Sequence, residues 1–389
     1  MLRKTIVLLI SLVFILLPCF PQSADTSTLT LVFTGDIMGH DEQIRGAWDD
    51  STKSYNYEPT FRYIKPFIEE ADIAIGNLEV TLAGPVYKGY PQFSSPDELA
   101  KAASAAGFDV MIQANNHALD RGVKGFTRTL NVLDTLGLIH TGTFRNRYER
   151  GVSYPLILEK NNIRIALLNY TYGTNGLVIP PPCIVNRIDT FAIRSDLQKA
   201  RLANPDFVIV TMHWGEEYQR TENLQQQILA SFLIRNGADA IIGSHPHVIQ
   251  PVKKVYPDPV DSSVYNIVVY SLGNFVSNQR AQYKDGGIVF HMTLTKTQAG
   301  TAMTDYQYLP YWVYRIDLSG KSSFYVLPVD LYFQHEAWFN MEEHDQYKIR
   351  RFYDDTREHL KGIPESDFFR DWKPEEEGEA AVGSSSIDQ

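Results

Sequence analysis

Short runs of mostly apolar residues recur along the chain, and a polar or glycine-containing motif follows each run. The runs lie at 29–33, 72–75, 109–112, 163–168, 207–210, 240–242 and 267–270. Apolar runs of this length are typical of strands that are buried on both faces of a sheet. We therefore expect these segments to form the interior strands of the fold.

Helical periodicity separates several of these expected strands. Apolar residues repeat at helical spacing over 61–68, 99–106, 126–136 and 228–233, and 95–98 is typical of a helix start. Strands that alternate with helices predict right-handed βαβ units and an α/β fold. From residue 285 onward the pattern changes to alternating strands, 288–294 and 324–327, which we expect to form a return layer of mostly antiparallel sheet. A terminal helix is expected over 342–360.

The composition fits a globular protein of about two to three domains, with 44% hydrophobic and 21% charged residues in 389. The net charge of −10 argues against a nucleic-acid-binding protein. Cys19 and Cys183 are too few for a zinc ribbon or a disulfide scaffold. We expect one main body over 25–340, a helical extension over 341–372 and a disordered acidic tail over 373–389.

The first 24 residues have the order of an export signal. Arg3 and Lys4 precede an apolar run over 5–17, and the small residues Ser23 and Ala24 follow it. An uncleaved membrane anchor through 5–20 is one alternative, and a lipoprotein cysteine at Cys19 is another. In each case we expect the main body outside the cytoplasmic membrane, in the periplasm or on the outer face of the cell envelope.

Chemically capable residues gather where the expected strands end. In open α/β sheets, ligands bind at the carboxyl ends of the strands. These ends carry two carboxylates, one amide and four imidazoles: Asp36, Glu79, Asn116, His117, His213, His245 and His247. Oxygen and nitrogen ligands in this mixture suit Mn²⁺, Fe²⁺, Co²⁺ or Zn²⁺. Two carboxylates, one amide oxygen and three of the imidazoles make six ligands, which are too many for one catalytic zinc, so we expect two divalent ions about 3.5–4 Å apart.

Roles within this set follow from order along the chain. Asp36 can bridge the two metals or bind the first of them, and Glu79 can be the other carboxylate. His117 follows Asn116 directly, so the two side chains cannot easily face one metal, and His117 is free to act as a general acid. Asp120 would fix the tautomer of His117, although a helix-start charge explains it equally well.

Two further expectations concern the course of the chain at 245–247 and the residues that bind substrate. Because Pro246 holds the segment between His245 and His247 extended, a loop bend must bring both imidazoles to the metals. We assign Asn77 and Asn274 to substrate binding, with an ordinary strand-to-loop turn as the alternative for Asn274. The loop at 87–90 is a candidate contact for a polymer or an ordinary surface loop.

Seven motifs follow one another along the chain: Gly35-Asp36, Gly76-Asn77-Leu78-Glu79, Phe93-Ser94-Ser95-Pro96, the segment 114–122 with Asn115-Asn116-His117, His213-Trp214-Gly215, Gly243-Ser244-His245-Pro246-His247 and Ser271-Leu272-Gly273-Asn274-Phe275. In this order they resemble the CapA-like family of poly-γ-glutamate capsule biosynthesis proteins. The family resembles calcineurin-like metallophosphoesterases, which implies a four-layer αββα sandwich and a dinuclear site. By that likeness the metal ligands are Asp36, Glu79, Asn116, His213, His245 and His247, and His117 is the catalytic acid. Met38 stands where the phosphoesterase pattern has a histidine.

Two functions are compatible with these features. One is an exported hydrolase with two divalent ions that acts on a phosphoester or on a γ-glutamyl amide. The other is a non-catalytic envelope factor that binds, exports or anchors an anionic polymer. The acidic net charge means that an anionic polymer needs local lysine or arginine residues, or the metals themselves, for binding.

Overall fold

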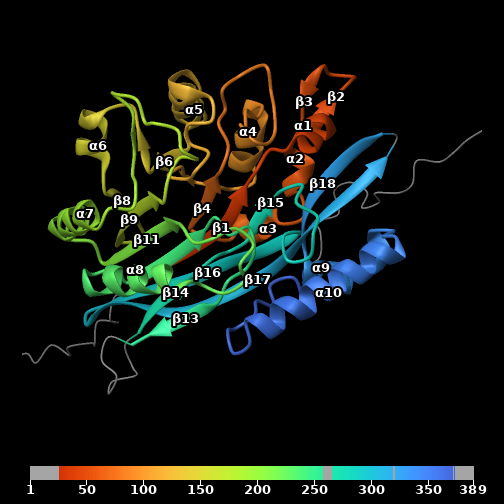
Figure 1. Ribbon diagram of the computed structural model, residues 1–389. Helices are drawn as coiled ribbons and strands as arrows, with labels where there is room; N and C mark the ends of the chain where they lie inside the picture. The colour runs from red at the N-terminus through yellow and green to blue at the C-terminus, as the bar shows by residue number, and fades with distance from the viewer. Residues whose placement is uncertain (1–25, 257–264, 319, 371, 373–389) are drawn as a thin grey trace, which may run out of the picture.

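The computed structural model describes residues 26–256, 265–318, 320–370 and 372, which form two large sheets with helices around them (Figure 1). The expected export segment at 1–24 and the expected tail at 373–389 lie outside the described residues. None of the helices in the described parts has the length and apolar character that a membrane crossing requires.

The first sheet has eight strands in the order β18-β17-β16-β1-β4-β5-β6, with β15 beside β1. Strands β1, β4, β5 and β6 run parallel to one another, whereas β16 pairs with β1 in antiparallel fashion and β17 and β18 follow it. The segment after residue 285 therefore extends this sheet instead of forming a separate layer. The bounds are β1 Ser27–Ile37, β4 Ile73–Leu78, β5 Val110–Ile112, β6 Ile139–Thr141, β15 Asn274–Val276, β16 Gly286–Thr297, β17 Gly300–Leu318 and β18 Lys321–Pro328.

The second sheet has six strands in the order β13-β14-β12-β11-β9-β8. Its central strands β9, β11, β12 and β14 are parallel. The bounds are β8 Leu156–Lys160, β9 Ile163–Thr171, β11 Phe207–His213, β12 Ala240–Ser244, β13 Val252–Val255 and β14 Asn266–Val269. Two small ribbons, β2 Trp48–Asp49 with β3 Ser54–Tyr55 and β7 Thr143–Phe144 with β10 Ile184–Val185, lie outside the large sheets.

Alternate residues of the second sheet face two different cores. On β9, Ile165 and Leu167 join the large cluster that includes the first sheet, whereas Ala166 and Leu168 join a cluster with helices α7 (Thr190–Leu202) and α8 (Leu224–Arg235). Successive strand residues point to opposite faces, so this division places the second sheet between the first sheet and a helical layer.

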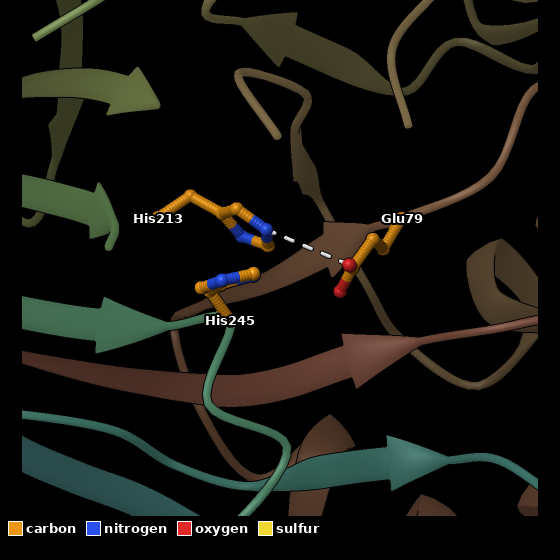
Figure 2. A group of neighbouring side chains, drawn as sticks. All are labelled: Glu79, His213 and His245. Carbon is orange, nitrogen blue, oxygen red and sulfur yellow. Dashed lines mark ion pairs between the residues drawn. The ribbon is translucent and has the colours of Figure 1, made fainter. Parts of the chain in front are cut away.

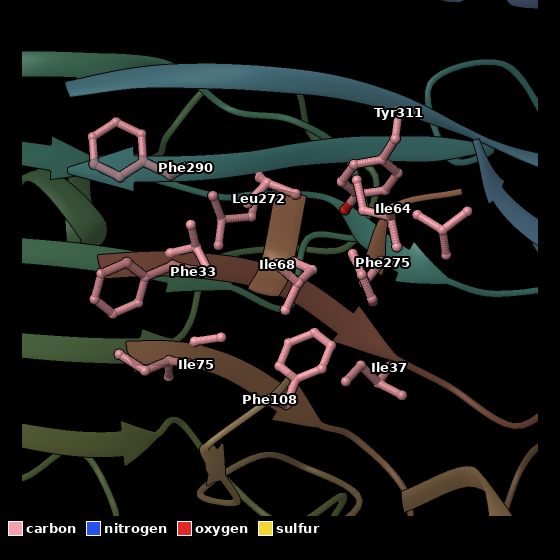
Figure 3. Packing of buried hydrophobic residues seen from close by; sticks show 14 of the residues in the cluster. Phe33, Ile37, Ile64, Ile68, Ile75, Phe108, Leu272, Phe275, Phe290 and Tyr311 are labelled. Atoms are coloured by element: carbon pink, nitrogen blue, oxygen red, sulfur yellow. The ribbon is translucent and has the colours of Figure 1, made fainter. Parts of the chain in front are cut away.

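Aromatic packing covers the other face of the first sheet. The Phe275 ring stacks on Phe61 at 6.0 Å and meets Phe108 at 5.5 Å and Tyr311 at 5.2 Å. Figure 3 shows Ile68 over the same group. These contacts bring the short helices α2 (Glu58–Phe61) and α3 (Lys65–Glu69) onto the sheet. The layers therefore run helix, sheet, sheet, helix, and the predicted αββα architecture is confirmed.

Two helix predictions differ in outcome. Helix α5 (Gly122–Leu136) ends where expected, at Gly137, whose φ of 71° is a left-handed conformation that glycine adopts without strain. The prediction of one helix over 61–68 is wrong, because α2 and α3 are separate and each has a proline in its first turn. Pro66 lacks an N–H and cannot continue a preceding helix.

The remaining helices include expected and unexpected ones. The expected helix after 95–98 is α4 (Asp97–Ala105), whereas α1 (Asp41–Ala47), α6 (Arg147–Ser153) and α7 were not expected from the apolar spacing. After β18 come α9 (Val329–Gln334), a 3₁₀ turn at Glu336–Trp338 and the expected terminal helix α10 (Glu343–His359). Ile349 and Phe352 of α10 are buried in the large core, so the C-terminal extension packs on the main body.

Candidate metal centre

The carboxyl ends of strands from both sheets meet at one place, and Asp36 near the end of β1 is fully buried there. A register shift between Thr34 and Asp36 interrupts the pairing of β1 with β4. Gly35 fills this position because a Cβ would lie 1.9 Å from the carbonyl oxygen of Gly273. A bulge of this kind re-aims the following side chain. Asp36 Oδ2 then lies 2.9 Å from Nδ1 of His247.

Glu79 lies directly after β4, and its backbone nitrogen donates to the carbonyl of Ile37 at 3.1 Å. The side chain is fully buried, yet neither carboxylate oxygen has a hydrogen-bond partner within the described residues. Oε1 lies 3.5 Å from Nε2 of His213 and 3.9 Å from Nε2 of His247. Figure 2 shows the His213 ring directed at Glu79, with His245 beside both.

His213 is the last residue of β11 and is 1% exposed. Its Nε2 lies 2.7 Å from Oδ1 of Asn116 as well as near Glu79, and its Nδ1 lies 3.2 Å from the Ser244 hydroxyl. Two oxygens from separate loops therefore converge on the same imidazole nitrogen. Such convergence of donor atoms is typical of a metal site.

A bend after β12 carries His245 and His247 into the same space. Both residues have left-handed backbone conformations, with φ of 99° and 57°. Non-glycine residues pay on the order of 1–2 kcal/mol for this conformation, so the surrounding contacts must hold it. The Tyr218 backbone N–H donates to the Pro246 carbonyl at 2.8 Å, and the Trp214 N–H donates to the Ser244 carbonyl at 3.1 Å. This is the loop bend that the sequence required.

Together the side chains form two groups that share one carboxylate. Glu79, His213 and His245 make one group, and Asp36, Glu79 and His247 make the other, each with ligand atoms within 4.8 Å of one another. The oxygens of Glu79 and Nδ1 of His245 are buried polar atoms that have no hydrogen-bond partner among the described residues. Divalent cations would satisfy them, so the donor set fits metal binding, and Glu79 belongs to both groups.

The electrostatics favour cation binding. Burial and the neighbouring Asp36 carboxylate raise the pKa of Glu79 well above its ordinary value. Burial also acts to raise the pKa of Asp36, but the hydrogen bond and charge of His247 hold that pKa below its ordinary value. Burial lowers the pKa of His213 well below its usual range and lowers that of His245 to about 3, and neighbouring imidazoles add to both shifts. Neutral imidazoles keep the lone pairs that metals require.

His117 belongs to neither group of candidate ligands, and its Nδ1 contacts Asp120. Its Nδ1 lies 2.7 Å from Oδ2 of Asp120, and both side chains are buried. The same Oδ2 accepts the backbone N–H of Phe93 at 2.7 Å, and the Phe93 ring meets the imidazole edge-on at 4.7 Å. A turn, with the Asp120 N–H donating to the His117 carbonyl, brings the pair together before α5 begins. The contact leaves Nε2 of His117 as the nitrogen that can reach a substrate.

Asn77 and Asn274 lie beneath the ligands, at positions paired with Asp36 in the strand register. The Asn77 amide donates to Oδ1 of Asp36 at 2.7 Å, and Asn274 donates to the carbonyls of His247 at 3.3 Å and Lys284 at 2.8 Å. These contacts position ligand residues. A role of either amide in binding substrate stays a prediction.

Two further residues at the site were not singled out from the sequence. Ser244 accepts a hydrogen bond from Asn77 and lies next to His213. Tyr172 follows the end of β9, and its ring lies 4.5 Å from that of His245. Burial raises the pKa of Tyr172 to about 12. Both residues follow or end apolar runs, which is the signal that identified the other site residues.

Met38 is buried and stays outside both groups. Its backbone N–H donates to the Val276 carbonyl at 2.9 Å, and its own carbonyl accepts from Gln43 at 3.0 Å. His40 is two residues further on, with its ring 5.4 Å from Phe93 and Nδ1 3.1 Å from Gln43. The second group therefore has Asp36, Glu79 and His247 without a further histidine from β1.

Comparison with known proteins identifies relatives in capsule synthesis. Capsule biosynthesis protein CapA of Bacillus anthracis is 29% identical over 303 residues, which cover 72% of this chain and 67% of that protein. PGA biosynthesis protein CapA of Bacillus subtilis (strain 168) is 29% identical over 308 residues, which cover 71% of this chain and 73% of that protein.

Solved structures give weaker similarities. NAD nucleotidase (NadN) of Haemophilus influenzae aligns with 88% of this chain and 64% of its own, at a TM-score of 0.48 and 12% identity. The calcineurin-like phosphoesterase YfkN from Bacillus subtilis aligns with 86% of this chain and 99% of its own, at a TM-score of 0.42 and 14% identity. Both scores lie below 0.5, so the fold assignment rests on the chain's own sheets and helices.

The decisive match is to a family profile. The family described as Bacterial capsule synthesis protein PGA_cap matches residues 30–279, which is more than half of the 389 residues. The matched range contains every residue of the two candidate ligand groups, together with His117 and Asp120. The chain therefore belongs to the bacterial capsule synthesis protein PGA_cap family.

Proposed function

We propose that this chain is a metal-dependent hydrolase in the synthesis of a capsule or a related envelope polymer. Two divalent ions, Mn, Fe or Zn, are held by Asp36, Glu79, Asn116, His213, His245 and His247. The observation that carries the proposal is Glu79, a buried carboxylate whose oxygens have no hydrogen-bond partner in the described chain and which belongs to both groups of ligands. A carboxylate shared by two cations would hold them close together, which suits a two-metal hydrolytic site.

The chemistry is hydrolysis of a phosphoester or of a γ-glutamyl amide. Bound divalent ions supply an activated water and neutralise charge that develops on the reacting group. As the bond from phosphorus or carbonyl carbon to the leaving atom breaks, the leaving oxygen or nitrogen takes a proton from Nε2 of His117. The water oxygen forms the new bond, and its released proton restores His117. Asp120 holds the imidazole so that Nε2 faces the substrate.

The pathway is supported by family membership and by the two CapA proteins, whose names refer to capsule and PGA biosynthesis. We propose an anionic polymer of this kind, or a phosphoester used in making it, as the substrate. We also propose export through residues 1–24, by a cleaved signal or by an anchor over 5–20. The mass of the mature protein recovered from cell fractions would distinguish a cleaved signal from a retained anchor.

The test of the function is a hydrolysis screen with the metal-loaded chain. Phosphomonoesters, phosphodiesters and γ-glutamyl peptides are assayed with the wild type and with Asp36→Asn and His213→Ala. We expect turnover of at least one class, lost in both variants and abolished by chelator. Glu216→Gln changes an exposed carboxylate outside the ligand groups and serves as the matched control. Turnover that survives both ligand substitutions would overturn the proposal.

A non-catalytic envelope factor is the second candidate, and Met38 favours it. A buried thioether stands where the phosphoesterase pattern has a histidine, so the second group has one imidazole fewer. A binding factor predicts that poly-γ-glutamate binds equally well to the wild type, Asp36→Asn and His213→Ala. Metal-dependent turnover of a bound polymer would exclude this candidate.

A further inference from the structure

A cavity of about 440 Å³ lies beside His117 and borders the metal-ligating set. Asn116 and His117 both line it, and Oδ1 of Asn116 lies 2.7 Å from Nε2 of His213. The volume is at the lower end of the roughly 300–1,000 Å³ of small-molecule sites, so it suits one sugar unit or one short polymer end. A group bonded to a reacting atom at the metals would enter this cavity on the side of the general acid.

The charge of the cavity is acidic. Its lining includes the carboxylates of Asp120 and Glu217, and no lysine or arginine of the described chain lines it. Asp120 is already engaged by His117 and by the backbone N–H of Phe93. Glu217 lines the cavity and is exposed, so its carboxylate is accessible to a ligand that binds there.

Aromatic and amide side chains complete the wall. Tyr90 is 69% exposed, and its ring lies 6.4 Å from that of Phe93, which in turn contacts His117. Gln92 and Asn175 supply neutral hydrogen-bonding groups. An aromatic ring face attracts cations, and amides bind hydroxyls. An anionic group placed here would meet the Glu217 charge with no lysine or arginine of the described chain in the cavity wall.

We propose that this cavity binds the leaving group of the reaction, and that Glu217 selects a leaving group that carries an ammonium group, such as an amino sugar. The proposal rests on the proposed hydrolase function and names its substrate class. An anionic polymer fits this reading only if its charged units lie outside the cavity.

Three hexose phosphates of similar size test the selection: glucosamine 6-phosphate, glucose 6-phosphate and 6-phosphogluconate. Their leaving groups carry an ammonium, a hydroxyl and a carboxylate. A hydrogen bond to a charged partner corresponds to a preference of about 10- to 100-fold. We expect kcat/KM of the metal-loaded wild type to fall in that order, about 10-fold or more from the first compound to the last.

Variants of Glu217 assign the preference to one carboxylate. Glu217→Gln is expected to bring the three kcat/KM values within about threefold of one another, and Glu217→Lys to reverse their order. Glu216→Gln, at the neighbouring exposed glutamate that does not line the cavity, should keep the wild-type order. Equal rates in the wild type, or a preference that survives Glu217→Gln, would overturn the proposal.

A binding measurement separates the cavity from the catalysis. The metal-free chain is titrated with glucosamine, glucose and gluconate, and binding is followed by NMR. We expect glucosamine to bind at least about tenfold more tightly than gluconate, and Glu217→Gln to remove the difference. This binding order without hydrolysis of any phosphoester would contradict the hydrolase function and keep the cavity assignment. Hydrolysis without the binding order would overturn the cavity assignment alone.

Discussion

Oε1 of Glu79 lies 3.5 Å from Nε2 of His213, and the oxygens of this buried carboxylate have no hydrogen-bond partner among the described residues. Glu79→Gln removes the charge that the two groups of ligands share. We expect the variant to bind at most one ion per chain. Metal at about 100 times its Kd stabilises a protein by about 2.7 kcal/mol, so the metal-induced rise in Tm should largely disappear. Thermal unfolding with and without Zn²⁺ measures it, and an unchanged rise would exclude Glu79 as a ligand.

Substitution of His117 tests its proposed role as the general acid. Its imidazole is held by Asp120 and stays outside both groups of metal ligands. We expect His117→Ala to keep the wild-type metal content and to lose at least about 10²-fold in kcat on a substrate whose leaving group needs protonation. Steady-state kinetics and elemental analysis of the same preparation give both values. Unchanged kcat would remove His117 from the mechanism.

Substitution of Asp120 tests whether this residue affects the reaction only by positioning the His117 imidazole. Oδ2 of Asp120 contacts both Nδ1 of His117 and the Phe93 backbone N–H, and an asparagine in its place keeps an acceptor oxygen but loses the charge that stabilises a protonated imidazole. We expect Asp120→Asn to lower kcat about tenfold or more, with KM nearly unchanged. In a His117→Ala background the same substitution should have no further effect on kcat. A further loss there would show that Asp120 contributes independently of His117.

Asp239 lies outside the candidate metal centre, and its raised pKa predicts that the free energy of unfolding depends on pH. Burial raises its pKa to about 6, against an ordinary value of 3.8, while its Oδ2 accepts the Val208 backbone N–H at 2.8 Å. The folded chain therefore binds this proton more tightly than the unfolded chain, and stability is lost as the pH rises from about 4 to above 6. Asparagine keeps an acceptor oxygen without the charge.

The measurement for Asp239 is urea unfolding at pH 4.5 and pH 7.5. We expect the free energy of unfolding of Asp239→Asn, relative to the wild type, to be larger at pH 7.5 by on the order of 1 kcal/mol. Other carboxylates cancel in this difference. A difference that does not change between the two pH values would contradict the raised pKa.

The sequence predicted the strands and the ligand set because both follow local patterns. Asp36, Glu79, His213 and His245 stand at or just after the ends of strands, and the parallel topology brings those ends together. Which carboxylate is shared depends on the register of β1 and β4 and on the bulge at Gly35, and apolar runs do not encode either. The sequence alone therefore offered Asp36 as the possible bridging carboxylate and assigned no such role to Glu79.

Other features depend on single residues or on loop packing. Pro66 divides a helical stripe that periodicity treats as continuous. Helix α7 was not predicted because two of its apolar residues, Phe191 and Leu202, are exposed and do not belong to the buried stripe of the helix. Asp189 caps the start of the helix. Glu217 reaches the cavity from a loop after β11, and no pattern in the sequence links that loop to His117.

The most direct test of the two-metal arrangement is the amount of metal bound to the purified chain, measured by elemental mass spectrometry without added chelator. The shared position of Glu79 predicts about two divalent transition-metal ions per chain, falling to one or none in Glu79→Gln. No bound metal in the wild type, even after incubation with Mn²⁺ and Zn²⁺, would contradict it.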